Sequence, residues 1–200
     1  MTYEPTKAPR SERLEFFKFQ YSCQIFAQAR KILVYIQDKK ILTGHPLHYT
    51  LWTSFMVAYG KPFKQRAPLR LDPVLVPEEF WEEHQTLLSF RDKMFAHTDL
   101  DLVAEHSLDS LNSIVAMVEN GNVKMGTGFI YPNEEATARY RSLVEKLIQK
   151  TNYHAAKRWE SWDVVVRQDG WYMINVGETS DDILLPIKWE AGSILGAEAP

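Results

Sequence analysis

The 200-residue sequence predicts a mainly α-helical fold, a four-helix up-and-down bundle that carries two small β elements. Four segments have apolar residues at three- and four-residue spacing, which is the period of a helix with one buried face. Two other stretches have short apolar runs on either side of Asn-Gly or Asp-Gly, a pattern typical of β-hairpins. We therefore expect a helical bundle over residues 10–160, with a hairpin between its third and fourth helices, and a small antiparallel β appendage over residues 161–190.

The first two helices are predicted at about residues 11–39 and 47–59. Apolar residues recur at helical steps in the first of them: Leu14, Phe17, Tyr21, Ile25, Ala29, Ile32, Leu33 and Ile36. Thr43-Gly44-His45-Pro46 ends this segment. The second segment is dense in aromatic residues, which we expect in the core rather than as a stacking platform. His45 and His48 have no acidic or thiol companions close by, so we expect them in the loop and at the surface.

The third helix, from about Pro77 to the region of His97, carries the residues most suited to chemistry. On an ideal helix of roughly 100° per residue, its buried arc consists of Phe80, Leu87, Leu88, Phe90, Met94 and Phe95. Arg91 falls in the middle of that arc, with His84 beside it. A guanidinium aimed at a core keeps its charge and requires an anion, either a carboxylate of this chain or a ligand phosphate.

His97 lies in the last turn of the same helix, where unpaired carbonyls and the helix dipole favour its protonated form. Asp99 is placed to orient the ring. Arginine binds phosphate in a bidentate manner and imidazole transfers protons near neutral pH, so the pair suits phosphodiester chemistry. Spacing alone favours structural roles, namely Arg91 in a buried salt bridge and His97 as a helix cap.

The loop between the second and third helices is basic. Between Gly60 and Pro77 it contains four prolines and four cations, with no acid before Asp72; the cations are Lys61, Lys64, Arg66 and Arg70. Two interpretations stand side by side, a solvated loop and a local phosphate-binding patch near the entry to the third helix.

The second half of the chain alternates between helix and strand signals. Residues 111–128 fit either a helix or a hairpin, and Asn120-Gly121 favours the hairpin. Asn133 begins a fourth helix that runs to about Arg158, with acids in its first turn. Hydrophobic runs at 164–166 and 171–174 flank Asp169-Gly170 and predict a second hairpin, to which 183–187 adds an edge strand.

Composition narrows the function classes. The net charge of −3 gives no global basic field, so nucleic-acid binding would need a local patch. The single cysteine, Cys23, excludes an internal disulfide. No apolar run approaches a membrane span, and residues 1–10 lack an apolar signal core, so we expect a cytoplasmic protein without membrane contact. No metal-ligand pattern or phosphate loop is present, so we expect neither metal nor cofactor.

Two landmarks resemble the HEPN domain family. The first is an Arg-polar-x4-His motif, Arg91-Asp92-Lys93-Met94-Phe95-Ala96-His97. Together with Thr98-Asp99, this segment resembles the sequence of a bacterial branch of the family linked to abortive infection. The second is Ala58-Tyr59-Gly60-Lys61-Pro62-Phe63. The resemblance covers roughly residues 10–101, about half the chain.

The resemblance implies a metal-independent endoribonuclease of toxin type. Arg91 would hold the scissile phosphate, His97 would be the general acid/base, and Asp92 would order the site. Lys93 could assist, and we assign the orientation of His97 to Asp99. Family members usually place two motifs across a homodimer interface, and an antitoxin protein is a possible partner. The alternative is a non-catalytic nucleotide- or protein-binding bundle. A carboxylate against Arg91 within one chain would favour that alternative, and an open Arg91–His97 cleft lined by Lys64 and Arg66 would favour the nuclease.

Overall fold

The computed structural model describes residues 7–41, 45–95, 113–128, 132–162, 171–176 and 184–187. The chain is mainly helical, as predicted, and all four principal helices are present. The elements are α1 (Arg10–Asp38), α2 (His48–Gly60), η1 (Pro62–Lys64), η2 (Pro73–Leu75), η3 (Glu78–Phe80), α3 (Trp81–Phe95), β1 (Ser113–Glu119), β2 (Asn122–Gly128), α4 (Glu134–Ser161), β3 (Trp171–Ile174) and β4 (Leu184–Ile187).

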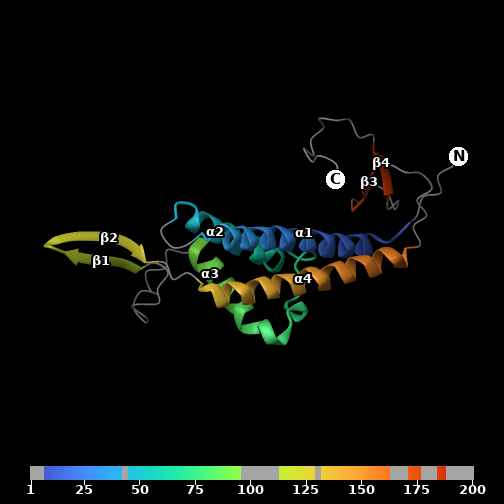
Figure 1. Cartoon of the computed structure of the whole chain (residues 1–200). Helices are drawn as coiled ribbons and strands as arrows, with labels where there is room; N and C mark the ends of the chain where they lie inside the picture. Colours follow the sequence, from blue (N-terminus) through green and yellow to red (C-terminus); the bar gives the residue numbers. More distant parts are fainter. Residues whose placement is uncertain are drawn as a thin grey trace.

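The two long helices, α1 and α4, run antiparallel along the length of the bundle (Figure 1). Contacts at both ends fix this direction. Arg141, near the start of α4, donates to the Gln37 side chain at 3.3 Å near the end of α1, whereas Arg158 pairs with Glu15 near the start of α1. Leu33 of α1 and Leu143 and Leu147 of α4 are completely buried between them. The apolar stripe predicted for α4 lies in the core, and the one predicted for α1 is correct in the second half of the helix. In the first half the prediction was wrong, because Phe17 is 37% exposed while Phe16 and Phe19 are buried.

The helix α2 packs on α1 and brings its aromatic residues into the core. Trp52, Phe55 and Tyr59 are at most 2% exposed, which confirms the prediction that they are core residues. His48, which we expected at the surface, is only 5% exposed. That prediction was wrong because α2 is apolar around most of its circumference, so no polar face identified its outer side.

The hairpin prediction for residues 111–128 is confirmed within the described residues. β1 and β2 pair antiparallel from Ser113↔Gly128 to Glu119↔Asn122. Asn120 and Gly121 both have positive φ, 52° and 77°, which is the geometry of a tight primed turn. The helical alternative for this stretch is therefore excluded at residues 113–128.

The C-terminal strands β3 and β4 form a second antiparallel pair, with Trp171↔Ile187 and Ile174↔Leu184 in register. The predicted partner strand 164–166 lies outside the described residues. After β3, the carbonyl oxygen of Asn175 accepts a hydrogen bond from Arg13 Nη1 at 2.9 Å, so this end of the appendage contacts the start of α1. Trp159 and Trp162 pack on Phe16 at the same end. These two tryptophans, at and just after the end of α4, therefore complete the core.

The third helical segment begins as a 3-10 turn, η3, and continues as α3. The predicted buried face is correct for Phe80 and Leu87, which are at most 8% exposed, and for His84, which is 1% exposed. No helix in the described part of the chain combines the length and apolar character that a membrane span requires.

Candidate functional site: a shared carboxylate beside a basic loop

Arg91, Asp92 and Lys64 form a cluster where α3 passes the loop after α2. Arg91 Nη1 donates to Asp92 Oδ1 at 2.7 Å, and Lys64 Nζ donates to Asp92 Oδ2 at 2.6 Å. The three side chains are 30%, 39% and 38% exposed, in the order Arg91, Asp92, Lys64. Two cations share one carboxylate, so the cluster keeps a net positive charge that faces solvent.

The Asp92 carboxylate is held in its ionised form by these neighbours. Partial burial alone would raise its pKa, but hydrogen bonds and charge attraction from Lys64 and Arg91 outweigh this, and the pKa falls below its ordinary value. Asp92 therefore acts as a fixed anion that orients both cations rather than as a proton donor near neutral pH.

The Arg91 side chain lies against Gly60, the last residue of α2. A Cβ built on Gly60 would come within 3.1 Å of Arg91 Cδ and 3.3 Å of Cγ. Because Gly60 has no side chain, the aliphatic part of Arg91 can pack directly against the backbone at the end of α2. The Arg91 Nε atom is buried and has no hydrogen-bond partner among the described residues. The guanidinium is positioned by packing on one side and by Asp92 on the other.

A buried tyrosine–histidine pair lies under this cluster. The Tyr59 hydroxyl and His84 Nδ1 are 2.7 Å apart, and Phe63 meets the His84 ring edge-to-face at 4.6 Å. Burial, assisted by the positive charge of Lys64, lowers the pKa of His84 to about 4. His84 is consequently neutral at pH 7 and serves as a hydrogen-bonded core residue.

These contacts unite the two sequence landmarks. Tyr59, Gly60 and Phe63 of the second landmark touch His84 and Arg91 on the third helical segment. The sequence indicated both segments and a core position for Tyr59, but it predicted neither the contact between the segments nor a role for Gly60. The spacing of His84 and Arg91, two helical turns apart, was the one available signal that both lie over the same surface.

The remaining predicted site residues have different positions. Lys61 Nζ lies 5.5 Å from the centre of the Tyr21 ring, a cation–π contact. Arg66 and Arg70 are exposed and form no ion pair with any described residue. Lys93 belongs to α3, but its side chain lies outside the described part. His97 and Asp99 also lie outside the described residues, so the predicted Arg91–His97 cleft has no described geometry.

Comparison of the chain with protein-family models, with curated proteins and with solved structures finds no match. The carboxylate that we expected for a non-catalytic module does lie against Arg91, and it is the adjacent Asp92. Within the described part of the chain, no three or more His, Cys, Asp or Glu side chains come together as a group that could hold a metal ion.

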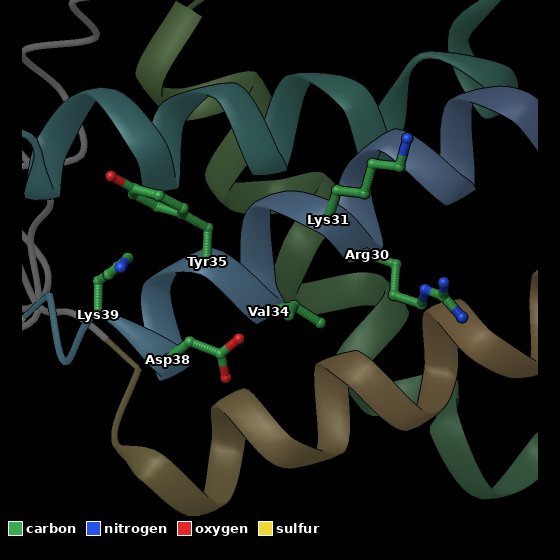
Figure 2. Close-up of a pocket in the computed structure, with 6 residues that line it drawn as sticks. All are labelled: Arg30, Lys31, Val34, Tyr35, Asp38 and Lys39. Carbon is green, nitrogen blue, oxygen red and sulfur yellow. The ribbon is translucent and has the colours of Figure 1, made fainter. Parts of the chain in front are cut away.

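A shallow hollow on the outer side of α1, of about 250 Å³, is a second polar surface. It is lined by Arg30, Lys31, Val34, Tyr35, Asp38 and Lys39. Figure 2 shows Lys31 and Tyr35 extending on the side of α2, while Arg30 lies over α4. Five of these residues belong to α1 and Lys39 follows its last residue, and none of the six belongs to the Arg91–Lys64 cluster.

Proposed function

We propose that the Arg91–Asp92–Lys64 cluster binds phosphodiester groups of RNA and that the chain is a metal-independent endoribonuclease of the HEPN-like toxin or abortive-infection type. The observation that carries the proposal is the sharing of one carboxylate by two cations, the exposed Lys64 and the partly buried Arg91. Arg66 and Arg70 follow in the same loop, so positive charge gathers locally in a chain whose net charge is −3. Phosphate contacts from arginine and lysine supply most of the affinity for nucleic acid.

In this proposal Arg91 holds the scissile phosphate and balances the charge that develops on its oxygens. His97 is the general acid/base, Asp99 orients its ring, and Lys93 assists. The RNA 2′-oxygen attacks phosphorus and loses its proton, and the 5′-oxygen leaves with a proton. The products carry a 2′,3′-cyclic phosphate end and a 5′-hydroxyl end. Because the side chains alone move the proton and balance the charge, cleavage should continue in excess chelator.

The same proposal includes a homodimer in the cytoplasm, with Arg91 and His97 near its twofold axis. The motif lies towards one end of a helix, and a single helix end encloses a substrate on only one side. An antitoxin protein that covers this end would suppress the activity. The arrangement of the four helices as a HEPN bundle is likewise part of the proposal.

A second candidate function is a non-catalytic bundle that binds a nucleotide or a protein. The contact between Asp92 and Arg91 favours it, because an in-chain carboxylate already satisfies part of the guanidinium. Binding would then use Lys64 and the part of the Arg91 guanidinium that Asp92 does not contact, and no proton transfer would be required. The two candidates share a binding surface, and they differ in the ligand and in whether a phosphodiester bond is cut.

The deciding experiment incubates the purified chain with total RNA in excess chelator and maps the new ends. We expect cyclic phosphate ends, and we expect His97→Ala to reduce the cleavage rate on the order of 10²–10⁴-fold, as for the loss of a general acid/base. His45→Ala is the control, since His45 is an exposed loop histidine that is not part of the cluster. Parent protein that binds RNA without cutting it would support the binding module, and parent protein that does neither would exclude the nuclease.

A further inference from the structure

The β1–β2 hairpin stands apart from the rest of the fold. It extends away from one end of the bundle (Figure 1), and within the described residues neither strand pairs with a third strand. Near its tip, the opposed residues Val118 and Val123 are 69% and 56% exposed. A two-stranded hairpin alone in water is marginally stable at best, so one that retains seven residues in each strand gains from a further partner.

The register identifies which backbone groups are available on the outer edge of β1. The two-residue turn makes Glu119↔Asn122 a hydrogen-bonded pair, and such pairs alternate along an antiparallel ladder. Ile114, Ala116 and Val118 therefore belong to the non-hydrogen-bonded pairs. Their N–H and C=O groups point away from β2, and each offers one donor and one acceptor to another strand.

The two edges of the hairpin differ in composition. Residues 114–118 of β1 form an unbroken apolar run, Ile-Val-Ala-Met-Val. β2 contains Lys124, Gly126 and Gly128, and lysine and glycine are residue types that discourage strand addition. The β1 edge is thus the one suited to accept a strand, and the β2 edge is the protected one.

We propose that β1 pairs with β1 of a second copy of this chain, antiparallel and centred on Ala116, to give a four-stranded intermolecular sheet. This register is self-complementary. It places Ala116 opposite its own copy, Ile114 opposite Val118 and Val115 opposite Met117, and Ser113 opposite Glu119. No like charges are opposed, and three residue pairs exchange about six backbone hydrogen bonds. The pairing is independent of whether the chain cuts RNA, and it makes β1, rather than the surface around Arg91 and His97, the interface that holds the two copies together.

The proposed register makes a direct cross-linking test possible. In a Cys23→Ser background, which removes the only native thiol, Ala116→Cys places two cysteines opposite each other across the twofold axis. The Cα separation of a hydrogen-bonded antiparallel pair is about 5.5 Å, within the range of a disulfide. We expect mild oxidation to produce a covalent dimer that reducing agent reverses. Ser113→Cys is the matched control, because its two copies would lie roughly 20 Å apart along the strands.

A second pair of variants tests the edge without new thiols. In Ala116→Pro, the N–H that is lost points away from β2, so no hydrogen bond between β1 and β2 is lost. Met125 lies directly opposite on β2, and Met125→Pro removes the corresponding outward N–H from the β2 edge. We expect Ala116→Pro to halve the mass measured by light scattering at roughly 50 µM, a concentration at which a stable dimer is populated. Met125→Pro should keep the parent mass, and circular dichroism should show parent helicity for both variants. A monomeric parent, cross-linking equal at 113 and 116, or an unchanged mass for Ala116→Pro would overturn the proposal.

Discussion

His84 is a histidine that the fold keeps neutral. It is 1% exposed, and its pKa is lowered to about 4 by burial and by nearby Lys64. Between pH 4 and the ordinary pKa of 6.5, the His84 side chain is protonated in the unfolded chain but stays neutral in the folded chain. The free energy of unfolding therefore falls as the pH is lowered through this window, and His84 accounts for a loss of about 2 kcal/mol between pH 7 and pH 5.

Urea unfolding at pH 7 and pH 5 checks this prediction. We expect the stability of the parent to fall more steeply than that of His84→Gln, which retains a hydrogen-bonding side chain but does not titrate. Equal pH dependence in the two proteins would show that His84 is not kept neutral by the fold. Asp92 and Glu83 also lose stabilisation in acid, but at lower pH, because both pKa values lie below the ordinary carboxyl value.

Tyr59 offsets the cost of burying His84, because its hydroxyl forms a hydrogen bond with the ring nitrogen Nδ1. Burial, together with the negative charge of Glu83, raises the pKa of the Tyr59 hydroxyl well above its ordinary value, so the hydroxyl stays protonated. Tyr59→Phe leaves a buried ring nitrogen without this hydrogen bond and should reduce the free energy of unfolding by about 1–3 kcal/mol. Tyr153→Phe, at an exposed position, should change it by less than about 0.5 kcal/mol in the same denaturation assay.

At the scale of elements, the crossing of α2 and α3 depends on Gly60. A methyl group there presses on Arg91 Cδ and Cγ, so Gly60→Ala should displace the guanidinium. Alanine is also a better helix former by about 1 kcal/mol, so the melting temperature should not fall sharply. If the chain cuts RNA, we expect the rate to fall by roughly tenfold to a hundredfold, as for a small misplacement of a positioning group.

A double-mutant cycle provides the control for this prediction. In an Arg91→Ala background the added methyl group has no arginine stem to displace, so Gly60→Ala should have little further effect on rate. Independent, additive losses would mean that Gly60 acts on the site by another route than Arg91.

The elements differ in how far the sequence could predict them. Strong periodicity predicted α1 and α4 within a few residues of their ends, and Asn133 caps α4 as expected, with its side chain accepting from Ala136 N at 2.8 Å. Asn120-Gly121 predicted the first hairpin because only a few residue types adopt positive φ. The position of His48 was mispredicted because an apolar helix offers no contrast between faces. The contact of Gly60 with Arg91 joins residues 31 apart in the chain, and local patterns carry no information about such a pair.

For the molecule as a whole, charge is distributed unevenly. The net charge is −3, yet Arg66 and Arg70 stand exposed in the loop that supplies Lys64 to the cluster. If single-stranded RNA binds through both arginines, Arg66→Gln with Arg70→Gln should make the slope of log affinity against log salt shallower by roughly 1.4, about 0.7 for each phosphate that is no longer neutralised.

A matched control variant changes two basic residues in the hollow on α1. Arg30→Gln with Lys31→Gln removes the same two charges from the outer side of α1 (Figure 2), so the net charge changes equally. Its salt slope, measured by fluorescence anisotropy over a salt titration, should equal that of the parent. Equal slopes for all three proteins would mean that the basic loop does not contact RNA.

The antiparallel packing of α1 on α4 has a consequence for synthesis on the ribosome. The first long helix emerges early, but the helix that covers it follows only after the loop, α3 and the hairpin have been made. Until then Phe16 and Phe19 of α1 lack the ring contacts that Trp159, Trp162 and His154 later supply. A chain interrupted before Glu134 would keep one half of its longest interface uncovered, and we expect such a product to aggregate or to be degraded rather than to persist as a smaller bundle.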